Sequence, residues 1–361
     1  MIVDDSAVIR GLTKRILETN DTIEVVASVG NGEYAVRAAE QKDIDVVVLD
    51  IEMPTMDGIT ALPLLIKANP KLRIIMSSTL TTRNAEISLK ALSLGAADYI
   101  PKPTSASELN SGDAFRQSLL EKVVALGAAS HRAQGISKDV PTRPGTSSSP
   151  KAVSAGSVDI SLRKAGTMVP DILAIGSSTG GPQALFEFFK GIPADWTLPI
   201  VITQHMPATF TRILADHIAS VAKRPCIESK GGEVITSGHI YVAPGDYHMI
   251  LEKNGAKIVT RLTQSSPENF CRPSVDPMMR SIVEIYGPRV LALILTGMGK
   301  DGLNGCEAVV AAGGTVVAQD EETSVVWGMP GAVATHGVCS AVLPLQEIAA
   351  HITNFKTRTA A

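Results

Sequence analysis

A single stretch rich in proline, serine, threonine and glycine divides this chain into two parts. Twelve of the seventeen residues from Pro141 to Ser157 are of these four types. Such a segment buries too little apolar surface to offset the entropy lost on ordering, so it predicts a flexible linker. We therefore expect two folded domains, residues 1–125 and 169–357, joined by a linker of residues 126–168.

Both parts alternate short apolar runs with helical patterns. The runs that predict strands are residues 2–3, 23–28, 45–49, 73–76 and 98–100 in the first part, and 171–175, 199–203, 290–295 and 315–318 in the second. Between them, apolar residues recur at spacings of three and four, as at Val8, Leu12 and Ile16. This alternation predicts two α/β domains, each with a doubly wound parallel sheet. In the second domain, two or three of a further set of runs predict a small antiparallel insert: His239–Ala243, His248–Leu251 and Lys257–Arg261.

Composition and charge exclude several classes of protein. The 33 Lys and Arg residues against 36 Asp and Glu give a net charge of −3, without the basic excess of a nucleic-acid-binding protein. No apolar run reaches the ~18 residues of a membrane span, and the first residues lack the pattern of a secretory signal. The cysteines form no Cys-x-x-Cys pair, and we expect buried, reduced thiols at Cys226, Cys271, Cys306 and Cys339. We therefore expect a cytoplasmic protein with no nucleic-acid partner and no membrane insertion.

Polar side chains follow four predicted strands of the first domain. They are Asp4 and Asp5, Asp50, Ser77 with Ser78 next to it, and Lys102. In a parallel sheet these positions meet at one edge. Three carboxylates there need a cation, and oxygen ligands beside a phosphoryl group favour Mg²⁺. A carboxylate next to Mg²⁺ and a lysine can accept a phosphoryl group, although an Asp-Asp pair alone also fits a capped helix start.

The segments VDDSA, VLDIEMPTMDG and DYIPKP resemble the receiver domain of two-component response regulators over about residues 1–105. The resemblance implies a flavodoxin-like (βα)5 fold and a histidine kinase as phosphodonor. It also implies a phosphoacceptor at Asp50, Mg²⁺ ligands at Asp4, Asp5 and Asp50, and phosphoryl contacts from Ser77 and Lys102. Only three residues precede Asp4, fewer than receivers usually have, so we expect either a start upstream of Met1 or a weakened domain.

A glycine-rich turn follows the first predicted strand of the second domain. The segment GSSTGGP at 176–182 contains Gly-x-Ser-x-Gly, a pattern that lifts a serine, here Ser178, out of a strand-to-helix turn. A dinucleotide-binding loop has a similar sequence. In such a loop an acidic residue at the end of the next strand binds the ribose, but this chain has Gln204 and His205 there. A purely structural glycine turn is the other alternative.

A serine nucleophile needs a base and an acid that orients the base. His205 ends the neighbouring predicted strand, and Asp301 follows the strand 290–295. If these strand ends converge, Ser178, His205 and Asp301 can form a triad. Glycines at 297 and 299 leave the backbone near Met298 free to approach a substrate oxygen, so its amide is an oxyanion candidate.

Six segments in order, GSSTGGP, ITQHMPATFT, IYVAPGDYHM, RPSVD, LTGMGKDG and VVWGMP, resemble the chemotaxis protein-glutamate methylesterases, the CheB family, over about residues 170–355. The resemblance implies hydrolysis of γ-glutamyl methyl esters on methyl-accepting chemoreceptors, and often deamidation of receptor glutamines. It puts the catalytic Ser, His and Asp at Ser178, His205 and Asp301, with Thr179 and Met298 at the flanks of the site. It further implies phosphorylation by the chemotaxis histidine kinase and no cofactor at the esterase site. We expect the chain to be a monomer.

Two other functions remain open at this stage. One is a serine hydrolase of different specificity, such as an amidase, with the same triad. The other is a phosphorylation-controlled binding module whose serine loop is catalytically silent. The sequence argues against a transcription factor, because no basic helix-turn-helix pattern follows the first domain.

Overall fold

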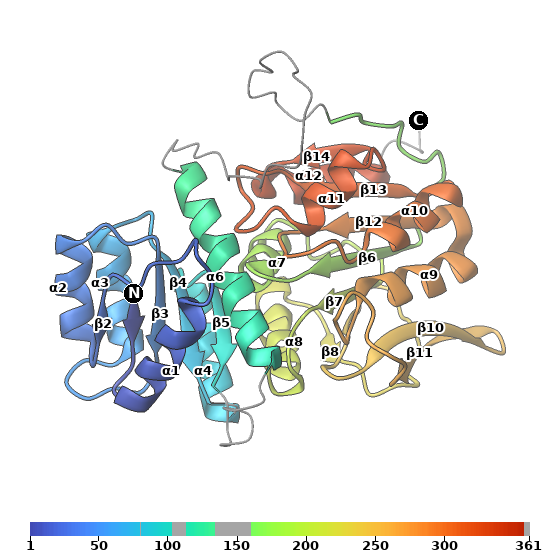
Figure 1. Cartoon of the computed structure of the whole chain (residues 1–361). Coiled ribbons are helices and arrows are strands. Elements are labelled where there is room, and N and C mark those ends of the chain that lie inside the picture. Colours follow the sequence, from blue (N-terminus) through green and yellow to red (C-terminus); the bar gives the residue numbers. More distant parts are fainter. Residues whose placement is uncertain (80, 103–112, 134–159, 357–361) are drawn as a thin grey trace, which may run out of the picture.

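The computed structural model describes residues 1–79, 81–102, 113–133 and 160–356. They form two α/β units that lie side by side, with helix α6 (Asp113–Ala133) between them in Figure 1. The prediction of two α/β folds is confirmed. The predicted linker is described only at its two ends: residues 126–133 continue helix α6, and residues 160–168 carry no helix or strand. Its remaining part lies outside the described residues, so the domain limits stay a prediction.

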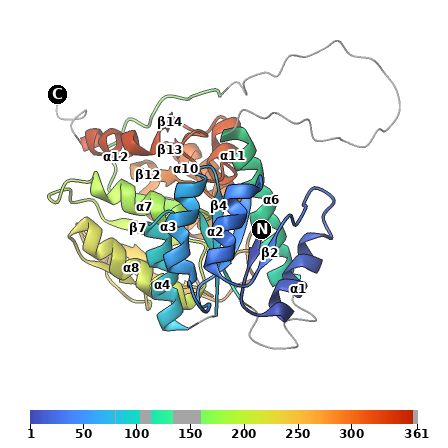
Figure 2. The same cartoon turned by 90° about the vertical axis from the view of Figure 1, so that its left-hand side faces the viewer.

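The N-terminal unit is a five-stranded parallel sheet in the order β2-β1-β3-β4-β5, the flavodoxin-like order. Its strands are β1 (Ile2–Val3), β2 (Ser28–Val29), β3 (Val46–Asp50), β4 (Arg73–Ser78) and β5 (Asp98–Pro101). Besides α6, its helices are α1 (Ala7–Leu17), α2 (Gly32–Gln41), α3 (Gly58–Ala68) and α4 (Thr82–Ser93). Figure 2 shows α2 and α3 in front of the sheet.

The strand predicted at 23–28 is wrong in its extent, because β2 covers only Ser28–Val29. β2 pairs with β1 alone, and β1 has two residues, so the ladder at this edge of the sheet cannot be longer.

The starts of the helices in this unit are well specified by the sequence. Four residues directly before a helix cap it by accepting a hydrogen bond from the backbone N–H three positions on: Ser6, Asn31, Asp57 and Thr81.

The C-terminal unit is a seven-stranded sheet in the order β14-β13-β12-β6-β7-β9-β8, in which every pairing is parallel. Its strands are β6 (Ile172–Ser177), β7 (Ile200–Gln204), β8 (Cys226–Glu228), β9 (Ile240–Val242), β12 (Val290–Ile294), β13 (Thr315–Gln319) and β14 (Ala341–Leu343). Its α-helices are α7 (Gly181–Lys190), α8 (Ala208–Ala222), α9 (Val275–Tyr286), α10 (Leu303–Ala311), α11 (Met329–Thr335) and α12 (Leu345–Thr353).

The small antiparallel insert predicted from two or three runs is confirmed, and it contains two of them. β10 (His248–Asn254) and β11 (Lys257–Thr263) form a two-stranded antiparallel sheet, as expected. The third run, His239–Ala243, does not belong to it, because β9 pairs in parallel with both β7 and β8 in the main sheet. All residues of β9 are buried, as an interior strand of a sheet covered on both faces requires.

The strand order places the site. β6 lies between β12 and β7. The strands that follow β6 in the sequence are therefore added on one side of it from β7 to β9 and on its other side from β12 to β14. Crevices at the carboxyl ends of such neighbouring strands are where open α/β sheets bind ligands. The segments that follow β6, β7 and β12 contain Ser178, His205 and Asp301, respectively.

The two units pack closely against each other. Helix α4 contacts α8 and α7, and the Tyr99 ring of β5 stacks on Phe210 of α8 with ring centres 4.2 Å apart. Met298 and Val325 of the C-terminal unit pack against an apolar cluster that includes Leu119 of α6. This face of the N-terminal unit therefore lies on the part of the C-terminal unit that surrounds the serine turn. Among the residues described, no helix is both long enough and apolar enough to cross a bilayer.

Candidate active site

The turn that carries Ser178 is fixed by glycines. Gly180 precedes helix α7 with a left-handed φ of 76°, and a Cβ at this position would lie 2.6 Å from Val325. A Cβ on Gly181 would collide with the side chain of Gln204 at the end of β7. The backbone N–H of Ser178 donates to Thr296 O at 3.0 Å. The turn thus holds Ser178 between the ends of β7 and β12. This is the position that the predicted strand-to-helix turn gives to the serine.

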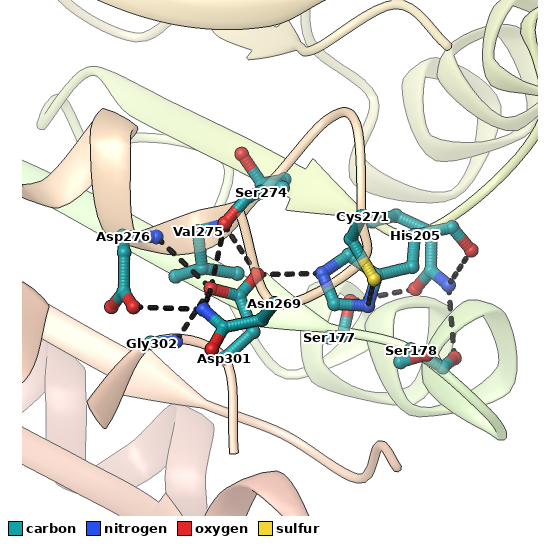
Figure 3. A network of polar contacts seen from close by, with 12 residues as sticks. Ser177, Ser178, His205, Asn269, Cys271, Ser274, Val275, Asp276, Asp301 and Gly302 are labelled. Atoms are coloured by element: carbon teal, nitrogen blue, oxygen red, sulfur yellow. Dashed lines mark hydrogen bonds and ion pairs between the residues drawn. The ribbon is translucent and has the colours of Figure 1, made fainter. Parts of the chain in front are cut away.

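An imidazole and a carboxylate meet beside this turn. His205 Nε2 lies 2.7 Å from Asp301 Oδ2, and the two side chains are 11% and 2% exposed. In Figure 3 the imidazole lies between the Asp301 carboxylate and the serine turn. The backbone N–H of His205 donates to Ser177 O at 3.0 Å, which ties the ends of β6 and β7 together. The predicted convergence of the three strand ends is therefore present.

The carboxylate of Asp301 is held by an unusually complete set of donors. Four groups besides His205 donate to it at 2.6–2.9 Å: the Asn269 amide, the Ser274 hydroxyl and the backbone N–H groups of Val275 and Gly302. Burial alone would raise the pKa of Asp301, but the hydrogen bonds from His205 and Val275 hold it below its ordinary value. Asp301 is thus kept ionised and fixed in orientation.

His205 is in turn held from both ring nitrogens. Nδ1 lies 3.4 Å from Cys271 Sγ, and among the described residues no hydrogen bond joins the Ser178 hydroxyl to the ring. Burial alone would lower the pKa of His205, but its contacts with Asp301 and Cys271 outweigh burial and raise the pKa from 6.5 to about 10. The sequence predicts buried, reduced thiols at all four cysteines. All four are free and three are buried, but the prediction of burial is wrong for Cys271, which is half-buried and contacts His205.

The predicted oxyanion groups flank the serine. A Cβ on Gly297 would lie 2.9 Å from both the Cβ and the N of Ser178, so the backbone before Met298 runs directly against the serine. Thr179 follows Ser178, and its carbonyl oxygen accepts a hydrogen bond of 2.9 Å from the Thr296 hydroxyl. The Thr179 hydroxyl points the other way, toward the N-terminal unit, where it donates to Asp98 Oδ2 at 2.8 Å.

A second polar cluster lies at the carboxyl edge of the N-terminal sheet. Carboxylate oxygens of Asp4, Asp5 and Asp50 all lie within 4.8 Å of one another. Lys102 Nζ lies 2.7 Å from Asp4 and 2.8 Å from Asp50. Burial raises the pKa of Asp50 to about 6 although Lys102 opposes the shift. An oxygen-only donor set of this kind fits a hard cation such as Mg²⁺.

The structure separates the two neighbouring serines of β4. Ser77 pairs in register with Asp50 on β3 and is buried. The hydroxyl of Ser78 instead shares a hydrogen bond of 3.1 Å with Ser88 on α4. Ser77 is therefore the serine that lies level with the carboxylate cluster.

Several polar residues of the site escaped sequence reasoning. Asn269 donates to both Asp301 and Asp276, and Gln204 bonds to Ser177 Oγ and to Ser178 O. Gln204 lies inside the segment ITQHMPATFT, and Ser274 and Asp276 lie inside RPSVD, but their contacts in the site were not predicted. Asn269 lies in none of the quoted segments, and nothing in its spacing indicates the contact with Asp301.

Comparisons with known proteins agree with this geometry. Residues 1–112 match the family model described as response regulator receiver domain, and residues 173–352 match that described as CheB methylesterase. A Rhodospirillum rubrum protein named protein-glutamate methylesterase/protein-glutamine glutaminase 1 is 56% identical over 363 residues, which cover 98% of this chain and 93% of that protein. The chain belongs to the CheB methylesterase family. It is a methylesterase with a response regulator receiver domain in front.

Other members of the CheB family support the assignment. An Azospirillum brasilense protein-glutamate methylesterase/protein-glutamine glutaminase is 55% identical over 367 residues, covering 100% of this chain and 93% of that protein. The crystal structure of the Thermotoga maritima CheB methylesterase catalytic domain is 40% identical, covers 53% of this chain and 100% of that chain, and superposes with a TM-score of 0.50. Membership of a methylesterase family favours the serine site over the dinucleotide loop that the glycine-rich turn also allowed.

Proposed function

We propose that this chain hydrolyses γ-glutamyl methyl esters on methyl-accepting chemoreceptors, with Ser178 as nucleophile, His205 as base and Asp301 as the acid that orients the base. The relatives from Rhodospirillum rubrum and Azospirillum brasilense are named both methylesterase and glutaminase, which supports deamidation of receptor glutamines as a second reaction. The observation that carries the proposal is the 2.7 Å contact of His205 with Asp301 beside the serine turn. Such a site works without a cofactor.

The hydrogen bonds of His205 determine the course of the reaction. A carboxylate can only accept, so Asp301 requires the proton of neutral His205 on Nε2 and leaves Nδ1 as the acceptor. For the reaction, His205 Nδ1 must therefore give up its contact with the Cys271 thiol and accept a hydrogen bond from the Ser178 hydroxyl instead. Ser178 Oγ then attacks the ester carbonyl while His205 takes its proton. Methanol leaves with that proton, and a water molecule activated by His205 hydrolyses the acyl-enzyme to the glutamate carboxylate.

Backbone amides near Thr179 and Met298 would hold the oxygen of the tetrahedral intermediate. Both stretches border Ser178, through Gly180 on one side and Gly297 on the other. The N-terminus of helix α7 lies at the same place and favours negative charge. A donor aimed at such an oxyanion contributes about 3 kcal/mol to catalysis.

The N-terminal unit would serve as the phosphorylation switch. In this proposal Asp50 accepts the phosphoryl group from the chemotaxis histidine kinase, while Asp4, Asp5 and Asp50 would hold Mg²⁺. When bound, Mg²⁺ would neutralise phosphoryl oxygens during transfer. Ser77 and Lys102 would then contact the transferred group, and Lys102 would have to give up its present ion pairs with Asp4 and Asp50.

The contact between the units supports inhibition by coverage. β5 carries Asp98 and Tyr99, which contact Thr179 and Phe210 of the C-terminal unit. β5 also pairs with β4 so that Ser77 lies opposite Ile100. A shift of Ser77 and Lys102 toward a phosphoryl group would therefore act on the strand that contacts the catalytic unit. A tenfold activation needs only about 1.4 kcal/mol of differential stability.

A serine-directed fluorophosphonate probe tests Ser178 as the nucleophile and distinguishes a serine hydrolase from a silent binding module. We expect the full chain to be labelled at Ser178, faster after treatment with a small phosphodonor, and not at all in Ser178→Ala. A product assay on methylated and on amidated receptor peptides separates the esterase from an amidase. A wild-type chain that resists the probe with and without the phosphodonor would support the silent binding module instead.

A further inference from the structure

A two-residue turn next to the catalytic pair has an unexpected sequence. Residues 268–271 form this turn: Cys271 N–H donates to Glu268 O at 2.9 Å, and Glu268 N–H donates to Cys271 O at 3.2 Å. Both central residues have left-handed backbones, with φ of 51° at Asn269 and 63° at Phe270. Turns of this type strongly favour Asn-Gly. Asparagine tolerates the conformation, but a bulky aromatic residue in it is strained.

Packing does not compensate this strain. The Phe270 side chain is 95% exposed, and no other large apolar residue in the described part of the chain is as exposed. The next, Val8, is 73% exposed. A glycine would satisfy the turn better, and a polar residue would suit the solvent better. Strained, exposed residues of this kind are concentrated where a protein contacts a ligand.

The rest of the turn is anchored in the site. The Asn269 amide donates to Asp301 Oδ1 at 2.9 Å and to Asp276 Oδ2 at 3.0 Å. Cys271 Sγ lies 3.4 Å from His205 Nδ1. The Glu268 carboxylate forms a two-point ion pair with Arg280 of α9 at 2.6 and 3.0 Å. Three of the four turn residues are thus fixed, and Phe270 projects from a rigid base that touches both His205 and Asp301.

We propose that Phe270 binds an apolar side chain of the protein substrate beside the modified glutamate. This rests on the proposed function for its substrate class, a glutamyl ester on a folded protein. Because residues 269 and 271 contact the catalytic pair, the ring stands at the rim of the site rather than within it. A protein that presents the ester must pass this rim, whereas a small molecule need not. Because the backbone that carries the ring is anchored before binding, only the side-chain torsions of Phe270 have to be ordered when the substrate covers it.

The variant Phe270→Gly tests the proposal in the full chain. Glycine fits the left-handed backbone, so the turn is retained and the melting temperature should stay equal or rise. Two rates are compared: methanol release from a methylated chemoreceptor cytoplasmic fragment, and labelling of Ser178 by a small fluorophosphonate. We expect the ratio of the first rate constant to the second to fall at least tenfold. Tyr34→Ala, which removes an exposed aromatic ring from α2, should leave the ratio as in the wild type.

Binding provides a readout that does not need turnover. In a Ser178→Ala background, Phe270→Gly should weaken binding of the receptor fragment at least fivefold. An unchanged rate ratio together with unchanged binding would overturn the role of Phe270. A fall in labelling as large as the fall in methanol release would also overturn it, because the turn would then act through the catalytic pair. If the wild type releases no methanol, the proposed function fails, and the binding comparison still decides the role of Phe270.

Discussion

The Thr179 hydroxyl, one residue beyond Ser178, donates a hydrogen bond of 2.8 Å to Asp98 Oδ2 of the N-terminal unit. The two residues are 81 positions apart, and the bond is buried. Asp98 is also paired with Lys122 of α6. Nearby, the Gln183 side chain of α7 donates to the backbone oxygen of Ala96. The N-terminal unit therefore contacts the serine turn itself, and not only more distant parts of the C-terminal unit.

Removing the Asp98 carboxylate should release part of this contact. We predict that Asp98→Ala raises basal methanol release about fivefold, since one hydrogen bond of this kind contributes about 1 kcal/mol. The further activation by a phosphodonor should shrink accordingly. Asp43→Ala, at an exposed position of the same unit, is the control. Equal basal rates in Asp98→Ala and the wild type would contradict inhibition through this contact.

Cys271 should contribute to the pH dependence of the esterase. Burial lowers the pKa of His205, but its contacts with Asp301 and Cys271 together raise the pKa to about 10, and a protonated imidazole cannot accept the proton of Ser178. Activity should therefore rise with pH as His205 loses its proton. In Cys271→Ala the pKa of His205 falls, so the acidic limb of the kcat/KM profile should move to lower pH. An unmoved limb would mean that the thiol does not influence the base.

The same raised pKa makes a prediction for stability. A histidine whose folded pKa lies above its unfolded value of 6.5 stabilises the fold below pH 6.5, and this contribution is lost as the pH rises toward 10. The stability difference between the wild type and His205→Ala should thus be larger at pH 6 than at pH 10. Urea unfolding at the two pH values measures it. A difference that grows with pH would reverse the predicted sign.

Gly297 should tolerate no side chain. A Cβ there would lie 2.9 Å from Ser178 Cβ and would also meet Met329 Sδ. We predict that Gly297→Ala lowers kcat about a hundredfold by displacing the serine, since misplacement by about 1 Å has an effect of this size. Gly11→Ala in α1 is a matched control, because a Cβ at that site meets nothing within 4 Å. It should leave kcat unchanged.

The proximity of Ser178, His205 and Asp301 was predictable for a physical reason. Each follows a predominantly apolar run, Asp301 six residues after its end, and parallel strands bring their carboxyl ends to one edge of the sheet. The same reasoning gathered Asp4, Asp50 and Lys102 in the N-terminal unit. Strand pairing was less predictable. The pattern of the run 239–243 fits a strand of an antiparallel hairpin as well as a strand of a parallel sheet. Its parallel pairing with β7 and β8 became visible only in the structure.

Contacts that depend on chain folding between the strands could not be predicted. Asn269 contacts Asp301 and Cys271 contacts His205 from the segment between β11 and α9, and no periodic pattern marks that stretch. The contact of Thr179 with Asp98 depends on how two complete domains dock. Nothing in the spacing of either residue specifies the docked position.

Methanol release from a methylated chemoreceptor fragment tests the central claim most directly. It should be measured for the wild type, Ser178→Ala and Asp50→Ala, each with and without a small phosphodonor. We predict release by the wild type that rises with the phosphodonor, basal release without activation by Asp50→Ala, and none by Ser178→Ala. Methanol release by Ser178→Ala at the wild-type rate would contradict the assignment of Ser178 as the nucleophile activated by His205 and Asp301.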